Sequence, residues 1–197
     1  AKKSGEPIVL VHSGVIYPAE RNPIHFFKAV SILKKQNHIN SKRLKIILRA
    51  TGHDELYQEM IASLSIEDII SLEPSLPYRD ALYEMMSADG LIILQGKGCN
   101  HQVPAKIYEY FRSYRPILAL TDGHGDTAMT MTQLNYHNIV CLDKTNDIVD
   151  ALISFLNGIE SGNIMVTDKI KVSEYSRYSA TKKLARCLDS IIADSTQ

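Results

Sequence analysis

A lysine and a glutamate stand three residues apart in the segment Val103–Tyr110, which has the sequence VPAKIYEY. Lys106 and Glu109 would share one face of a helix, because residues three apart are neighbours on a helix surface. Pro104 suits the first turn of that helix, since proline fixes φ and lacks an N–H that would be unbonded there. The free N–H groups of a first turn and the positive end of the helix dipole attract anions. The segment therefore predicts a phosphate site with a carboxylate one turn further on, placed to reach sugar hydroxyls.

The same two residues have a simpler interpretation as a surface ion pair, which contributes little to stability. Apolar Ile107 and Phe111 occupy the opposite face of the predicted helix. We therefore expect Lys106 and Glu109 to face solvent or a cleft, and both interpretations stay open from these residues alone.

Short apolar runs alternate with amphipathic segments along the chain, which predicts six β-then-α units. The expected strands are Ile8–Ser13, Leu44–Ala50, Ile69–Glu73, Leu91–Leu94, Ile117–Thr121 and Asn138–Leu142. The expected helices are Ile24–Gln36, Asp54–Leu64, Tyr78–Ser87, Pro104–Tyr114, Thr127–Leu134 and Asp147–Asn157, with Tyr175–Ala193 as an extra C-terminal helix. Strict alternation requires a parallel sheet covered on both faces. We predict an α/β fold with a doubly wound, six-stranded parallel sheet, in a single domain that spans residues 1–197.

In open α/β sheets, ligands bind beyond the carboxyl ends of the strands. Gly14, after the first expected strand, lets the backbone approach a ligand, and Arg21 can neutralise phosphate through a bidentate contact. A turn glycine and a solvated arginine would explain the same residues. The chain has neither the dinucleotide fingerprint of three spaced glycines nor the P-loop pattern, which disfavours NAD and the usual ATPase chemistry. Five loops follow the carboxyl ends of the expected strands and are therefore candidate ligand-binding loops: Gly14–Pro23, Thr51–Asp54, Pro74–Arg79, Gln95–Val103 and Asp122–Thr127.

Three histidines, His12, His101 and His124, are expected near strand ends, where catalytic groups collect. No pair of them has the spacing of a zinc-binding helix, so no metal site is expected. A single histidine in a loop is usually polar surface. The segment Asp122–Thr127 is either a phosphate- or sugar-facing loop or a plain turn with Asp126 as a helix N-cap.

The composition excludes several classes of protein. Lys+Arg and Asp+Glu both number 22, and a net charge of +0 argues against a nucleic-acid binder that works through bulk positive charge. No apolar stretch is long enough to span a bilayer, so we expect no membrane insertion by this domain. The three cysteines, Cys99, Cys141 and Cys187, are far apart, which indicates a reducing compartment and a cytoplasmic location.

The order of several motifs resembles the C-terminal, nucleotide-sugar-binding half of retaining GT-B glycosyltransferases of family four. The resemblance covers nearly the whole chain and implies a Rossmann-like half of a GT-B fold. The motifs that carry it are Gly14, Tyr17 and Arg21 in the first loop, then Leu76–Arg79, Ala88–Leu94, Val103–Tyr110 and Arg115–Leu120.

The resemblance implies a role for each matching position. Glu109 matches the family's second conserved glutamate and is expected to bind the ribose hydroxyls, whereas Arg21 is expected at the diphosphate and Leu76 at the nucleobase. The positions expected around the donor nucleotide sugar are Gly14, Arg21, Leu76, Val103, Pro104, Lys106 and Glu109.

Two positions depart from the family pattern. His101 stands where many members carry an earlier glutamate, and Val15 stands where many carry an arginine. A divergent subgroup or a different sugar donor would account for both. The candidate catalytic residues are Arg21 and His101.

The implied reaction is glycosyl transfer from a nucleotide diphosphate sugar to an acceptor sugar or lipid-linked glycan, as in polysaccharide biosynthesis, without a cofactor or metal. The resemblance also implies an N-terminal acceptor domain, which this chain does not contain, and leaves open a peripheral membrane association of the full-length protein. Two alternatives remain: half of a nucleotide-sugar 2-epimerase, which shares the architecture, and a non-catalytic nucleotide-binding module.

Overall fold

The computed structural model describes residues 5–164, 166 and 169–194. Its strands form one parallel sheet in the order β3-β2-β1-β4-β5-β6, which confirms the predicted fold class. The strand order reverses between β1 and β4, and ligands bind at such switch points in open α/β sheets. The strands are β1 (Ile8–Ser13), β2 (Leu44–Arg49), β3 (Ile70–Glu73), β4 (Gly90–Leu94), β5 (Ile117–Leu120) and β6 (Ile139–Val140).

The central strands are buried on both faces of the sheet. Leu10 and Val11 are neighbours in β1 and therefore point to opposite faces, yet both are buried. This is why such strands have continuous apolar sequences rather than alternating ones. The prediction for β6 was wrong in length, because only Ile139–Val140 of Asn138–Leu142 pairs with β5 at this edge of the sheet.

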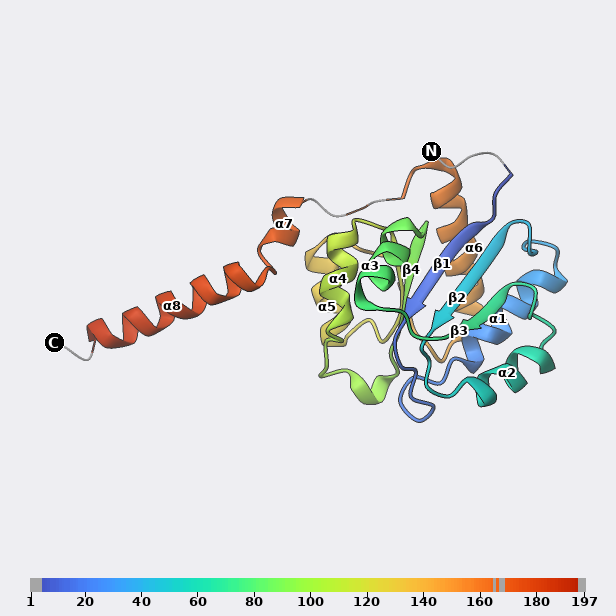
Figure 1. The fold of residues 1–197 in the computed structure, drawn as a ribbon, viewed down its shortest axis with the longest axis horizontal. Coiled ribbons are helices and arrows are strands. Elements are labelled where there is room, and N and C mark those ends of the chain that lie inside the picture. Colours follow the sequence, from blue (N-terminus) through green and yellow to red (C-terminus); the bar gives the residue numbers. More distant parts are fainter. Residues whose placement is uncertain (1–4, 165, 167–168, 195–197) are drawn as a thin grey trace.

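Helices cover the two faces in two groups of three (Figure 1). One face carries α1 (Ile24–Lys35), α2 (Asp54–Ser63) and α6 (Thr145–Ser161). The other carries α3 (Tyr78–Ser87), α4 (Lys106–Ser113) and α5 (Asp126–Gln133), and a short 3-10 turn, η1 (Lys97–Cys99), follows β4. The helices that precede and follow β4 thus lie on the same side as each other.

The bounds of α6 and α5 differ from the sequence prediction. Helix α6 runs beyond the predicted Asp147–Asn157 at both ends and stops where Gly162 takes a positive φ of 69°. Asp126 is the first residue of α5 rather than its N-cap, because Gly125 occupies the capping position with extended backbone.

The C-terminal part of the chain contains two helices, α7 (Lys169–Ser173) and α8 (Arg177–Asp194), where one over Tyr175–Ala193 was predicted. Tyr175, between them, packs beside Tyr108 of α4 with their ring centroids 6.0 Å apart. Helix α8 then projects away from the rest of the domain (Figure 1). Its apolar side, which includes Leu184 and Leu188, is exposed.

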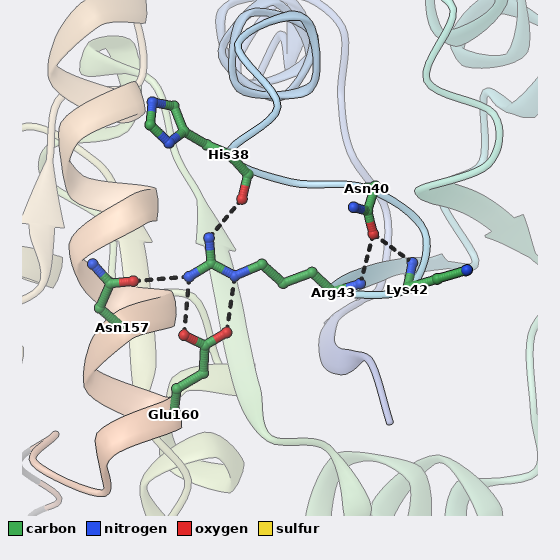
Figure 2. Close-up of polar contacts among 6 residues, drawn as sticks. All are labelled: His38, Asn40, Lys42, Arg43, Asn157 and Glu160. Atoms are coloured by element: carbon green, nitrogen blue, oxygen red, sulfur yellow. Dashed lines mark hydrogen bonds and ion pairs between the residues drawn. The ribbon is translucent and has the colours of Figure 1, made fainter. Parts of the chain in front are cut away.

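Arg43 lies at the amino ends of the strands, opposite the carboxyl ends where ligands are expected. Its guanidinium donates to both carboxylate oxygens of Glu160 at 2.9 Å and to Asn157 Oδ1 at 2.8 Å, both on α6. A third bond reaches the His38 carbonyl oxygen at 2.5 Å, so the side chain joins the turn before β2 to α6 (Figure 2). These polar groups are mutually satisfied, which gives the cluster a structural role.

Candidate functional site

Gly14 opens the candidate site at the carboxyl end of β1. Its φ of 109° lies in a region that side chains rarely adopt. A Cβ atom on this residue would lie 2.9 Å from Lys106 Nζ, so a larger residue would displace the lysine. The Gly14 N–H donates to the Arg49 carbonyl oxygen at 2.8 Å, which extends the ladder between β1 and β2 into the loop. The structure thus brings two of the predicted site residues, Gly14 and Lys106, into contact.

Lys106 turns inward from the first turn of α4. Its Nζ lies 3.2 Å from His12 Nε2. Burial of the ammonium and then the nearby Arg21 guanidinium lower the pKa of Lys106 to about 8, whereas the Glu109 carboxylate opposes the shift. Of the two predicted surroundings, solvent or a cleft, the Lys106 ammonium has the more enclosed one, between His12 and Gly14. Among the described residues it forms no surface ion pair with Glu109.

His12, in β1, is completely buried beneath this lysine. Its Nδ1 lies 2.9 Å from the Ile92 carbonyl oxygen in β4. Burial, and then the Lys106 charge, lower the pKa of His12 to about 3, so the ring is neutral at physiological pH. His12 lies within the predicted strand Ile8–Ser13, so the expectation of polar surface for a histidine in a loop does not apply to it. The signal in the sequence was its place in an otherwise apolar strand.

Arg21, in the loop between β1 and α1, lies close enough to Lys106 for its charge to lower the pKa of that lysine. Its Nε atom is buried and has no hydrogen-bond partner among the described residues. Its guanidinium carbon lies 5.8 Å from the centre of the Tyr17 ring, which orients the head group. Burial and then the Glu20 carboxylate raise the pKa of the neighbouring Cys99 thiol, and the Arg21 charge only partly opposes this shift. Arg21 as a whole is only half-buried, so the rest of its guanidinium group remains able to meet a ligand.

The start of α4 differs from the prediction. The helix begins at Lys106, and Ala105 is its N-cap, so Pro104 precedes the helix instead of occupying its first turn. The first bonds are of the tighter three-residue type, from Ile107 N to the Pro104 carbonyl oxygen at 2.9 Å and from Tyr108 N to Ala105 at 3.3 Å. Both Val103 and Pro104 are half-buried beside the helix start.

A buried glutamine fixes the loop that leads into α4. Gln95 Nε2 donates to the carbonyl oxygens of Cys99 and Gln102 at 2.5 and 2.8 Å, and its Oε1 accepts from Thr127 Oγ1 at 2.6 Å. Thr127 Oγ1 also lies 2.9 Å from the Gln102 carbonyl oxygen. Gln95 begins the predicted ligand-binding loop Gln95–Val103, but no local signal beyond its place directly after a buried strand indicated this bonding role. The network holds the segment before Val103 in one conformation.

Glu109 lies one turn beyond Lys106 and meets a different element. The Tyr78 hydroxyl, at the start of α3, donates to Glu109 Oε1 at 3.2 Å. The Glu109 charge raises the pKa of Tyr78. Leu76 precedes Tyr78 by two residues and is exposed, so the segment predicted at the nucleobase lies close to the carboxylate predicted at the ribose.

His101, the other candidate catalytic residue, is exposed in the loop between η1 and α4. Within the described ranges, no hydrogen bond connects its side chain to Gly14, Arg21 or Lys106. Its catalytic role stays a prediction from the resemblance.

A separate cavity of about 250 Å³ opens on the α1 side of the same sheet edge. Its lining includes Glu20, His25, Lys97, Asp122 and Cys141, but not Gly14, Lys106 or Glu109. Several of these groups already have partners, for example His25 Nδ1 with Thr145 Oγ1 at 2.8 Å. We therefore place the candidate site at Arg21 and Lys106, which form no ion pair among the described residues.

Neither a metal centre nor a membrane span is evident in residues 5–164, 166 and 169–194. Within these ranges, no three His, Cys, Asp or Glu side chains are grouped to hold a metal ion. Likewise, no helix there has both the length and the apolar character needed to cross a bilayer.

The fold is the Rossmann-like α/β fold found in GT-B glycosyltransferases. Similar solved structures include the lipopolysaccharide outer core galactosyltransferase WaaB, with a TM-score of 0.69 at 13% identity over 96% of this chain and 51% of that one. A glycosyltransferase from Rickettsia africae has a TM-score of 0.66 at 15% identity over 96% and 49%. TarM from S. aureus, solved in a complex that includes UDP, has a TM-score of 0.63 at 16% identity, over 96% of this chain and 36% of that one.

At these identities the likeness establishes the fold alone. The chain spans 36% to 51% of the length of these three structures. No protein-family profile and no curated protein sequence matches the chain.

Proposed function

We propose that this domain binds the diphosphate of a nucleotide diphosphate sugar and forms the donor half of a glycosyltransferase. The observation that carries the proposal is the pair of cations at the switch point between β1 and β4. Among the described residues, neither Arg21 nor Lys106 forms an ion pair, and Arg21 Nε has no acceptor. Partly buried cations are normally paired, so an anionic ligand is the missing partner.

The arrangement has a chemical use in glycosyl transfer. When the glycosidic bond to the donor phosphate breaks, negative charge develops on the departing diphosphate. Cations and N–H donors that are already oriented lower the barrier, because they need no reorganisation during the reaction. Arg21, Lys106 and the backbone before α4 would supply them, and Glu109 would hold the ribose. The glycosyl acceptor would bind to a further domain of the whole protein.

Calorimetry with UDP, GDP and their sugars tests the proposal. We expect one of these nucleotides to bind, and Lys106→Met to weaken it by at least about tenfold, because the variant loses a charge-assisted contact. Lys144→Met is the matched control, since Lys144 is exposed and pairs only at the surface, with Asp147 at 3.6 Å. Failure of the folded wild-type domain to bind any of these ligands would overturn the proposal. Epimer formation from a bound UDP-sugar would favour the epimerase instead.

A further inference from the structure

The tautomer of His12 follows from its partners. The Ile92 carbonyl oxygen, 2.9 Å from Nδ1, can only accept a hydrogen bond, so Nδ1 must carry the proton. A neutral imidazole has one N–H group, which leaves Nε2 as an acceptor. Lys106 Nζ lies 3.2 Å from Nε2 and can only donate while it is charged. The hydrogen bonds therefore run in one direction, from Lys106 to His12 and from His12 to β4.

This chain of bonds fixes a long and otherwise flexible side chain. Lysine loses up to about 2 kcal/mol of rotamer entropy when it is ordered, so a free lysine would not stay in one orientation. His12 cannot move, because it is wholly buried and anchored to the backbone of β4. On the other side, the absent side chain of Gly14 leaves the space that the ammonium fills.

We propose that His12 is a positioning residue that holds the Lys106 ammonium at the carboxyl end of β1, ready for an anionic ligand. The inference rests on the proposed diphosphate site and adds a residue that would not touch the ligand. The charged or titratable groups around the ammonium are His12 from β1, Arg21 from the β1–α1 loop and Glu109 on α4 itself. Of these, only His12 accepts a hydrogen bond from it among the described contacts.

The first test needs no ligand. In ¹⁵N NMR of the histidine-labelled domain, we expect His12 to show a neutral ring with the proton on Nδ1 from about pH 8 to about pH 5. A ring that titrates near its ordinary pKa, or one with the proton on Nε2, would overturn the proposal.

The second test follows Lys106 itself. Acetylation of the free amine, read by mass spectrometry across pH, reports the pKa of Lys106, which is about 8 in the wild type. His12→Asn keeps a donor for Ile92 but loses the acceptor for the ammonium, so the charged form is less favoured and the midpoint should move to lower pH. His12→Gln offers an oxygen further out and should restore it. A midpoint that stays unmoved or rises in His12→Asn would overturn the proposal.

The third test measures how His12 and Lys106 together affect the binding of UDP and GDP. We expect about tenfold weaker binding in His12→Asn, partial recovery in His12→Gln, and little further effect of His12→Asn once Lys106→Met is present. Ser31→Ala is the matched control, because Ser31 is also buried and donates to the Leu64 carbonyl oxygen at 2.9 Å, away from the site. Additive effects of the two site variants would overturn the positioning role.

The proposed function and this inference fail in different ways. If the wild type binds neither probe, the proposed function falls, and the Lys106 midpoint still decides whether His12 controls the ammonium. If the wild type binds and His12→Asn binds equally well with an unmoved midpoint, the proposed function stands and the role of His12 is refuted.

Discussion

The Tyr78 hydroxyl donates a hydrogen bond to Glu109 Oε1 across 3.2 Å, although 31 residues separate the two in the chain. Tyr78 begins α3 and Glu109 lies in α4, so the contact joins the helix that precedes β4 in the chain to the helix that follows it. If Glu109 binds ribose, a hydroxyl of the sugar takes over an acceptor that Tyr78 now uses.

The Glu109 carboxylate should give the site a preference for ribose. We expect the wild type to bind the preferred nucleoside diphosphate about tenfold more tightly than its 2′,3′-dideoxy counterpart, since hydrogen bonds to a charged group are the stronger ones. Glu109→Ala should bring the ratio close to one. Glu59→Ala, on the exposed face of α2, serves as the control. A ratio that Glu109→Ala leaves unchanged would remove Glu109 from the ribose site.

Gly14→Ala should disturb the site far more than its size suggests. The substitution places a Cβ at a φ of 109° and 2.9 Å from Lys106 Nζ, so it strains the backbone and displaces the ammonium. We expect a stability loss of about 1–3 kcal/mol and at least about tenfold weaker nucleotide binding. Gly123→Ala, where no atom lies within 4 Å of the added Cβ, should change neither. Calorimetry and urea unfolding measure both effects.

Nucleotide binding should weaken on the alkaline side of neutrality. The pKa of Lys106 is about 8 in the free domain, and a bound diphosphate raises it because it favours the charged ammonium. Affinity should thus be flat below about pH 8 and fall above it, by up to about tenfold per pH unit. Lys106→Met should abolish this dependence. An equal decline of affinity in the wild type and in Lys106→Met would show that another group causes the pH dependence.

Acid should destabilise the domain through His12. The folded-state pKa of His12 is about 3 and its ordinary value is 6.5, so between these values the unfolded chain binds the extra proton. Stability therefore falls as the pH drops through this window, by at most about 5 kcal/mol from this residue. His12→Gln should be less stable at neutral pH but should lose less on acidification. Urea unfolding at several pH values would show parallel curves if the prediction is wrong.

The ion pair between Arg49 and Glu84 should contribute more to the free energy of unfolding than an ion pair at the surface does. Arg49 donates to both Glu84 oxygens, at 2.5 and 2.6 Å, and the side chains are only 10% and 19% exposed. Arg49→Met leaves a shielded carboxylate unpaired, which should cost about 3 kcal/mol in urea unfolding.

The matched comparison is Lys34→Met, which breaks a pair with Asp68 in which the side chains are 32% and 43% exposed. Its cost should stay below about 1 kcal/mol. Equal costs for Arg49→Met and Lys34→Met would contradict the argument from burial. Arg49 also donates to the Pro74 carbonyl oxygen at 2.6 Å, so its loss should loosen the segment before Tyr78.

The sequence by itself determined the order of strands and helices and hence the fold class. Runs such as Leu91–Leu94 and stripes such as Ile24, Phe27 and Val30 are local patterns, and their period reports which surfaces must be buried. The ends of helices and strands were less well determined where they depend on residues distant in the chain or on irregular hydrogen bonds. Pro104 was expected inside α4 but precedes it, because the first turn is closed by the tighter three-residue bonds.

Only the tertiary structure decided what each polar side chain does. His12 and Lys106 are 94 residues apart, and nothing in the sequence around either residue predicts contact with the other. Helix periodicity placed Lys106 beside Glu109, but the packing of α4 against β1 turned its ammonium inward to His12, while Glu109 met Tyr78 instead. The cause is physical: burial and hydrogen-bond partners come from segments that the chain brings together only when the sheet assembles.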